Sequence, residues 1–422
     1  MIDVNLVLEH PEKIKKAAAD KGIIIDAEAL VKKVTAYKDV FVEVQNLREE
    51  RNKFAKAVST AKPEERQSLI EKGKKLKEKL DKKEDELRMM HEGIHPILMT
   101  IPNPAKSDVK VGKDDTENDV IRTYKEPKKF DFPLKDHLEL GEQLGIIDVE
   151  RAAKVSGARF YYLKGDGVML ELALIRFALD TLMAEGFTPV TPPVLIKKET
   201  MQGLGYMENG GAEDMFTVPS DDLILVGTAE QSLVPMHKDE TLQKKDLPRR
   251  YVGFSPSFRR EAGSYGKDTR GILRVHQFNK VEMVSFVEQG KDDEEHDFLL
   301  SLEEKMFQAL DIPYQVVKMC TGDLGFPAAR KYDIEAWMPT QKKYREVTSA
   351  STCTDFQSRR LKMRYRDGDK TEYLNVLNGT GFAIGRTIIA IMENYQQPDG
   401  SIIIPEVLRK YFGKDVIAAK TK

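Results

Sequence analysis

The chain has 422 residues, of which 41% are hydrophobic and 32% are charged, and its formal net charge is −2. This length exceeds one simple core, so we expect two domains, and the small net charge excludes recruitment of a polyanion by the protein as a whole. Only two cysteines occur, and neither a zinc-ligand spacing nor an apolar run long enough to span a membrane is present, so we expect a soluble, cytoplasmic protein without a disulfide framework, zinc or a membrane partner.

Two long helices are predicted in the first hundred residues. Apolar residues recur in alternating steps of three and four from Leu30 through Phe41 to Val58, and again from Ile70 to Ile97, with occasional polar interruptions. This is a heptad pattern. Pro63 separates the two runs and suits the first turn of the second helix. The pattern predicts an antiparallel coiled-coil hairpin over about residues 27–98, with arms of about 45–50 Å. Its lysine-rich segment EKGKKLKEKLDKKEDELR is typical of a solvated face, and RNA contact is the alternative.

The rest of the chain predicts a second domain of a different kind. The proline-containing stretch that follows the hairpin is predicted to be a linker over residues 106–120, which leaves 1–105 as the N-terminal domain. Over residues 121–422, long helical stretches alternate with runs of short strands. This order favours an α+β domain built on an antiparallel sheet rather than regular βαβ units.

The segment FRREAGSYGKDTRGILRVHQF, with its clustered arginines, predicts part of a long antiparallel hairpin. Strand alternation would place Arg259 and Glu261 on one face of the first strand. It would place Arg274, His276, Phe278, Lys280 and Glu282 on one face of the return strand. Arginines can clamp a phosphate and an aromatic ring can stack on a base, so the hairpin is a candidate nucleotide site. A surface ladder of ion pairs is the alternative.

Three further segments carry candidate chemistry. YLNVLNGTGFAIGRTIIAIMENYQ predicts a strand, a glycine-rich turn and a helix with Arg386, and too little sequence follows it to complete a dinucleotide-binding fold. In YREVTSAS, Glu346 precedes several hydroxyl residues, as a Mg²⁺–carboxylate site requires, although a Ser/Thr-rich loop is the alternative. In LILVGTAEQSL, Thr228 and Glu230 follow a short apolar strand.

Taken in this order, the segments resemble the motifs of the class II aminoacyl-tRNA synthetases, and specifically those of the seryl-tRNA synthetase family. GFTPVTPPVL resembles motif 1, FRREAGSYGKDTRGILRVHQFNKVE resembles motif 2, and NGTGFAIGRTIIAIMENYQ resembles motif 3. VGTAEQSL resembles the family's TAE serine-binding loop, and REVTSASTCTDFQSRR resembles the segment that lines the ATP site. The N-terminal hairpin matches the family's tRNA-binding arm, so the resemblance covers essentially the whole chain.

The resemblance implies that the chain uses ATP to convert L-serine to seryl-adenylate and then transfers serine to the 3′ end of tRNA(Ser). Charging of tRNA(Sec) is an open second activity. The resemblance also implies Mg²⁺ as the cofactor with ATP, no zinc, and a homodimer with Pro193 at its interface.

The resemblance further implies roles for individual residues. The implied catalytic residues are Arg259, Glu346 and Arg386. Glu346 and Ser349 match the Mg²⁺ ligands, and Arg270 is placed in a mobile loop. The implied ATP-binding residues are Arg259, Arg260, Glu261, Arg274, Val275, Phe278, Glu346, Val347, Thr348, Ser349 and Arg386. The implied serine-binding residues are Thr228, Ala229, Glu230, Arg259, Glu282, Asn378 and Thr380.

The sequence departs from the family pattern in two ways. Thr348 and Thr380 stand where serine is usual, and Thr352 stands where asparagine is common; the first two keep a hydroxyl, so we expect modest effects. The segment MQGLGYMENGGAEDMFTV replaces a run that usually contains glycine and lysine, and the sequence assigns it no role.

Two other functions are weighed against this one. The first is a related ligase that adenylates a small amino acid and delivers it to a carrier protein, and such relatives lack the long arm. The second is a coiled-coil RNA-binding protein with an inactive catalytic domain. The intact residues Arg259, Glu261, Glu346 and Arg386 argue against that second function.

Overall fold

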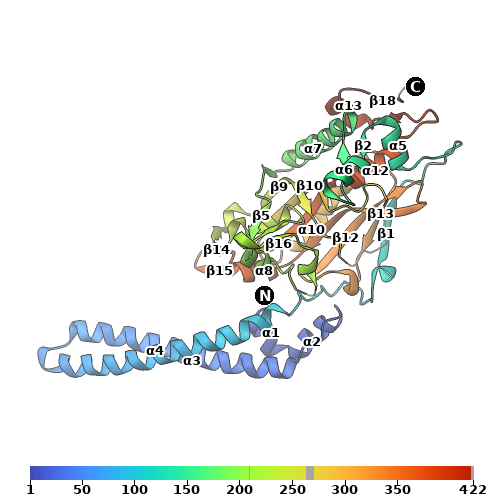
Figure 1. Ribbon diagram of the computed structural model, residues 1–422. Helices are drawn as coiled ribbons and strands as arrows, with labels where there is room; N and C mark the ends of the chain where they lie inside the picture. Colours follow the sequence, from blue (N-terminus) through green and yellow to red (C-terminus); the bar gives the residue numbers. More distant parts are fainter. Residues whose placement is uncertain (209, 263–269, 420–422) are drawn as a thin grey trace. The chain divides into compact units, whose positions relative to one another are not determined.

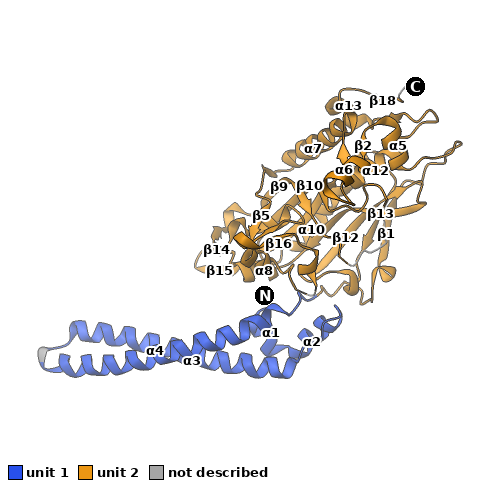
Figure 2. Cartoon of the chain, viewed as in Figure 1, with its two compact units in different colours: residues 1–104 blue, residues 105–422 orange. Residues whose placement is uncertain are grey.

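The computed structural model describes residues 1–208, 210–262 and 270–419. The chain divides into two compact units, residues 1–104 and 105–422 (Figure 2). Residues between 105 and the first strand belong to the second unit, where the amide of Lys106 donates to the carbonyl of Ala329. The division of the chain into an N-terminal tRNA-binding domain, a linker and a catalytic domain stays a prediction.

Unit 1 is built from helices (Figure 1): α1 (Val4–Glu9), α2 (Pro11–Ala19), α3 (Ala27–Thr60) and α4 (Pro63–Met99). The Asp26 carboxylate accepts a hydrogen bond from the amide of Ala29 and so caps the start of α3.

The predicted hairpin over residues 27–98 is confirmed, because α3 and α4 pair along their lengths (Figure 1). Their shared core contains Val40, Val44, Leu47, Leu76 and Leu80. Ile70, the first residue of the second predicted run, is 40% exposed, and two other positions of the predicted pattern shift by one residue. Val40 is buried where Phe41 was expected, and Leu98 is buried where Ile97 was expected. Heptad spacing thus predicted the two helices and most of the side chains between them.

Unit 2 is built on a sheet that has eight strands in the described part of the chain, in the order β1-β11-β12-β13-β16-β10-β9-β4. Neighbours are antiparallel except β4 and β9, which are parallel. The predicted α+β class with an antiparallel sheet is therefore confirmed. The strands are β1 (Asp119–Tyr124), β4 (Thr188–Val190), β9 (Arg249–Phe258), β10 (Gln277–Val287), β11 (Tyr314–Lys318), β12 (Arg330–Met338), β13 (Lys343–Thr352) and β16 (Asn375–Ala383).

Three helices, α7 (Asp166–Ala184), α10 (Asp292–Ala309) and α12 (Ile384–Tyr395), share one hydrophobic core with this sheet. Shorter helices surround it: α5 (His137–Leu144), α6 (Val149–Ser156), α8 (Lys198–Leu204), α9 (Glu230–Leu233), α11 (Phe356–Leu361) and α13 (Glu406–Phe412). Smaller sheets pair β2 (Ile147–Asp148) with β3 (Tyr162–Leu163), β7 (Leu223–Leu225) with β5 (Leu195–Lys197) and β6 (Thr217–Val218), β14 (Arg364–Asp367) with β8 (Thr241–Gln243) and β15 (Lys370–Tyr373), and β17 (Ile402–Ile403) with β18 (Val416–Ile417). In none of the described segments is a helix long and apolar enough to cross a membrane.

The structure corrects the strands predicted for the arginine-rich segment. β9 ends at Phe258 and β10 begins at Gln277, so the predicted alternation through Arg259, Glu261 and Arg274 is wrong. Glu261 has a φ of 55°, in the left-handed region, which ends the strand geometry. Phe278 and Glu282 do lie on one face of β10, since both line the same cleft. Residues 263–269 of the predicted connecting loop lie outside the described residues.

One buried histidine makes the stability of unit 2 sensitive to acid. Nε2 of His296 on α10 donates to the carbonyl of Ala350 at 2.9 Å, and Nδ1 accepts from Nε of Arg330 at 3.2 Å. Burial, assisted by the charge of Arg330, lowers the pKa of His296 to about 4.

We expect the free energy of unfolding to fall by up to about 3 kcal/mol as the pH drops from about 6.5 towards 4. In this range the imidazole of His296 is protonated in the unfolded chain but stays neutral in the folded protein. Urea unfolding followed at several pH values measures the effect, and the His296→Gln variant should lose much of this pH dependence. Equal pH dependence in both proteins would contradict this account.

Candidate active site

A cleft of about 390 Å³ in unit 2 gathers most of the residues that the sequence singled out. Strands β10, β13 and β16, the start of α12 and the loops beside them form its walls. The predicted residues that line it are Thr228, Glu230, Arg259, Glu261, Arg274, Val275, Phe278, Glu282, Glu346, Val347, Thr348, Ser349, Asn378, Thr380 and Arg386. Segments separated by more than 150 residues therefore meet at one site.

Two residues predicted to bind substrates, Ala229 and Arg260, are not among those that line the cleft, and neither is Pro193, which was predicted at a dimer interface. Ala229 is fully buried, and Pro193 lies exposed between β4 and β5. The guanidinium of Arg260 lies 5.4 Å from the centre of the Phe216 ring. The structure thus places Arg260 in contact with an aromatic side chain outside the set that lines the cleft.

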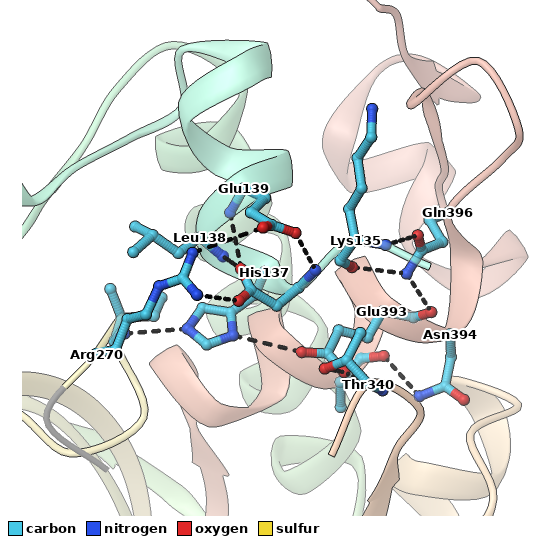
Figure 3. Close-up of polar contacts among 12 residues, drawn as sticks. Lys135, His137, Leu138, Glu139, Arg270, Thr340, Glu393, Asn394 and Gln396 are labelled. Carbon is cyan, nitrogen blue, oxygen red and sulfur yellow. Dashed lines mark hydrogen bonds and ion pairs between the residues drawn. The ribbon is translucent and has the colours of Figure 1, made fainter. Parts of the chain in front are cut away.

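Arg270 contacts the N-terminus of α5 (Figure 3). Its guanidinium forms ion pairs with Asp136 at 3.1 Å and Glu139 at 3.7 Å. Beside it, the amide of Ile272 donates to Nε2 of His137 at 3.2 Å, and Nδ1 of that ring lies 3.4 Å from Glu393 Oε1 on α12. These contacts fix the segment that leads from Arg270 into the cleft.

One end of the cleft combines arginines with an aromatic ring. The guanidinium carbon of Arg259 lies 5.3 Å from the centre of the Phe278 ring, and Nε donates to the carbonyl of Gly227 at 3.2 Å. Nη1 of Arg386 donates to the carbonyl of Glu346 at 2.9 Å and to its Oε2 at 3.0 Å. Two positive charges beside an accessible π surface are the features that recognise a nucleotide and its phosphates.

Charge keeps Glu346 ionised. Burial alone would raise the pKa of this carboxyl, but the neighbouring guanidinium of Arg386 and the ammonium of Lys331 outweigh burial and lower the pKa to about 2. Further along the same wall, Nη1 of Arg274 donates to Oε2 of Glu261 at 2.8 Å. The left-handed turn at Glu261 is therefore held by an ion pair at the edge of the cleft.

A β-bulge aims two oxygen ligands into the same cleft. Thr348 on β13 pairs with Ile334, and Glu346 pairs with the next residue along, Glu335, so Val347 is the extra residue. In a regular strand, side chains three positions apart point to opposite faces, but the bulge brings Glu346 and Ser349 to the same side. A carboxylate and a hydroxyl are hard oxygen donors, which fits a Mg²⁺ ion.

The other end of the cleft is a buried, acidic subsite. Oε2 of Glu282 lies 2.6 Å from Nζ of Lys280 and accepts from the hydroxyl of Thr380 at 3.5 Å. Nζ of Lys280 also donates to the hydroxyl of Thr228 at 3.3 Å. Burial raises the pKa of Glu282 to about 7, against the opposing charge of Lys280, and burial also raises the pKa of Glu230.

Sequence reasoning gave no role to several side chains that line this site, among them Lys280, Lys331 and Tyr206. Strand alternation did place Lys280 on the face of Phe278 and Glu282, each two positions away from it, but assigned it no role. Lys331 and Asp333 lie two residues apart on β12 and form an ion pair at 3.3 Å, as strand alternation allows. No local pattern in the sequence marks Tyr206.

Comparisons with known proteins agree with this geometry. The family model described as "Seryl-tRNA synthetase N-terminal domain" matches residues 1–105, and "tRNA synthetase class II core domain (G, H, P, S and T)" matches residues 216–395. The chain is 46% identical over 422 residues to a serine–tRNA ligase of Thermobifida fusca, covering 99% of each chain. It is 43% identical over 419 residues to the serine–tRNA ligase of Rubrobacter xylanophilus, again covering 99% of each.

A solved structure extends the match to three dimensions. The crystal structure of seryl-tRNA synthetase from Pyrococcus horikoshii complexed with ATP superposes with a TM-score of 0.88 at 41% identity and covers 100% of both chains. The structure of cytoplasmic serine–tRNA ligase from Naegleria fowleri in complex with AMP superposes with a TM-score of 0.85 at 30% identity. The match covers 100% of this chain and 99% of that one. With full-length identity at this level and both family models in the expected order, the chain belongs to the seryl-tRNA synthetase family.

Proposed function

We propose that the chain activates L-serine with ATP to form seryl-adenylate and transfers the serine to the 3′ end of tRNA(Ser). The observation that carries this proposal is that one cleft brings together two chemically different groups of residues. One group combines Arg259, Arg386 and Phe278. The other group contains the buried Glu230 and Glu282.

The proposed first step needs positioning and charge rather than a protein nucleophile. The serine carboxylate attacks the α-phosphorus, a carboxyl–phosphate bond forms, and the bond to pyrophosphate breaks. Arg259, whose charge also acts on Glu230 and Glu282, would hold the carboxylate and the α-phosphate together. Phe278 would stack on the adenine. Arg386 would bind the departing phosphates.

Glu346 and Ser349 would hold Mg²⁺ through a carboxylate and a hydroxyl oxygen. When bound, the ion would neutralise phosphate charge. The salt bridge from Arg386 keeps the Glu346 carboxylate ionised for this role, because its pKa lies far below neutral pH.

Selection of serine follows from the acidic end of the cleft. Glu230 would bind the α-ammonium, and Glu282 with Thr380 would bind the side-chain hydroxyl. Alanine would leave the buried Glu282 and Thr380 without a partner, so we expect strong rejection of alanine without an editing step.

Pyrophosphate exchange with serine, alanine, glycine and threonine tests the proposal. Exchange that depends on serine, with the other three amino acids far weaker, is the expected result. Preference for alanine or glycine would favour the carrier-protein ligase, and exchange with none of the four would favour the inactive RNA-binding protein. A tRNA(Sec) transcript added to the charging assay tests that second acceptor.

We also infer that the protein acts as a homodimer in the cytoplasm. Helix α7 leaves apolar side chains exposed, among them Leu172 at 52% and Met183 at 47%, and such surfaces mark protein interfaces. Pro193 would lie at the same interface, as its position in the motif 1 segment implies. Cys320 and Cys353 are both buried thiols, which suits a reducing compartment.

Leu172→Glu is expected to shift the protein from dimer to monomer, because the charge would have to be buried in the interface. Sedimentation velocity measures the change. Ile24→Glu, at a residue that is 99% exposed in unit 1, is the control. A Leu172→Glu protein that stays dimeric would place the interface elsewhere.

A further inference from the structure

The segment MQGLGYMENGGAEDMFTV, to which the sequence assigned no role, contributes a side chain to the acidic group of cleft residues. The phenol of Tyr206 donates to Oε1 of Glu230 at 2.6 Å. The amide nitrogen of Gln357 reaches the same oxygen at 3.3 Å and also donates to the carbonyl of Leu204 at 3.3 Å. Tyr206 itself lines the cleft. The unusual segment therefore touches the carboxylate to which we assign the substrate ammonium.

A buried ion pair anchors this segment to α11. The side chain of Arg360 is 0% exposed, and its Nη1 donates to Oε1 of Glu208 at 2.7 Å and to the carbonyl of Gln202 at 3.1 Å. Its guanidinium lies 4.3 Å from the centre of the Phe356 ring and 5.4 Å from that of Phe326. Breaking a buried pair leaves a charge without compensation, so the pair holds the backbone on both sides of Tyr206 in place.

The backbone between these contacts is also constrained. Gly205 has a φ of 85°, and a Cβ at this position would lie 3.0 Å from the Phe356 ring and 3.4 Å from the Arg360 guanidinium. Only glycine combines that φ with so close an approach. Gly205 therefore lets the chain turn from α8 towards Glu230 and present Tyr206 to the cleft.

The groups around Glu230 explain why the phenol of Tyr206 is a suitable donor to its carboxylate. Charged groups from several elements face it: Lys280 and Glu282 on β10, and Arg259 after β9, with the thiol of Cys353 near the Tyr206 phenol. Lys280 is already engaged by Glu282 and Thr228. The side chains seen to donate directly to the Glu230 carboxylate, Tyr206 and Gln357, are neutral. Neutral donors orient a carboxylate without cancelling the negative charge that attracts an ammonium.

We propose that Tyr206 is a positioning residue for amino-acid recognition. It holds one oxygen of Glu230 and leaves the other to the substrate's α-ammonium, and the Glu208–Arg360 pair anchors it there. This inference rests on the proposed function, because it assigns the segment that contains Tyr206 a role in serine selection.

Tyr206→Phe tests the proposal in serine-dependent pyrophosphate exchange. The Michaelis constant for serine is expected to rise about tenfold, as loss of one hydrogen bond to a charged group predicts. The constant for ATP and the turnover number should stay unchanged. Inhibition by 3-hydroxypropanoate, which lacks the ammonium group, should also stay unchanged, because Tyr206 acts through the residue that binds that group.

Tyr251→Phe is the matched control. Tyr251 belongs to the hydrophobic cluster against which Tyr206 packs, and its hydroxyl bonds to Nε2 of His237 at 3.0 Å rather than to Glu230. The substitution removes the same atom from a buried tyrosine away from the cleft, so the constant for serine should match the wild type. Glu208→Gln is the second variant, and it should raise the constant for serine while sparing that for ATP.

The outcomes separate this inference from the proposed function. A wild-type constant for serine in the Tyr206→Phe enzyme would overturn the positioning role alone. An equal rise in the constants for serine, ATP and 3-hydroxypropanoate inhibition would also overturn it, by indicating general damage to the cleft. A wild-type protein without serine-dependent exchange would overturn the proposed function, and the inference with it.

Discussion

Replacing Arg259 with alanine is expected to lower serine-dependent pyrophosphate exchange by about a thousandfold, the effect of removing a donor that acts mainly on transition-state charge. The guanidinium lies 5.3 Å from the centre of the Phe278 ring, and its charge also acts on Glu230 and Glu282, so it is near the groups assigned to both substrates. Truncation would remove the charge that aligns the serine carboxylate with the α-phosphate. Exchange of labelled pyrophosphate into ATP at saturating serine measures the loss.

Arg249→Ala is the control for this variant, because Arg249 lies at the other end of β9 and does not line the cleft. Its exchange rate should match the wild type. Binding of tRNA, measured by filter retention, should be unchanged in both variants. A comparable loss of tRNA affinity in Arg259→Ala would mean that this arginine faces RNA rather than the substrates of adenylation.

Shortening the coiled-coil arm is expected to impair tRNA charging while leaving serine-dependent pyrophosphate exchange intact, the opposite of the Arg259→Ala result. If a glycine–serine turn replaces residues 37–91, aminoacylation of tRNA should fall on the order of a hundredfold or more, because a surface of many cationic contacts is lost. Exchange with serine should persist, since every residue of the cleft lies in unit 2. The lysines of α4 over residues 72–82 are exposed and available for such contacts.

The design leaves the base of the hairpin intact, where Leu30, Val34, Ile94 and Leu98 are buried. Raised salt offers an independent check on the full-length protein, since it should weaken tRNA charging more than exchange. Parallel loss of charging and exchange in the shortened protein would overturn the separation of tRNA binding from adenylation.

Local rules predicted the parts of this protein in which contacts repeat along the chain. The heptad spacing located α3 and α4 because each turn of a helix buries the same kind of residue against its partner. It missed by one residue at Val40 and Leu98, where the packing of real side chains selects the neighbour of the ideal position. Strand alternation likewise placed Phe278 and Glu282 on one face.

The same rules failed where the chain leaves regular geometry. The strand predicted through Arg259 and Glu261 ends at Phe258 instead. Glu261 takes a left-handed φ, which a strand does not contain, and pairs with Arg274. The shared direction of Glu346 and Ser349 depends on the bulge at Val347, whose position is set by pairing with β12. A bulge is a property of two strands, so the sequence of one strand does not reveal it.

The sequence by itself therefore determined the class of protein, through motifs whose order matches the seryl-tRNA synthetase family, and most of the residues that it singled out for substrate binding meet in the cleft. Only the tertiary structure decided how the segment around Tyr206 contributes. Tyr206 meets Glu230, and Glu208 meets Arg360 about 150 residues further along the chain. Such contacts leave no periodic trace, because they depend on where the folded backbone brings distant residues together.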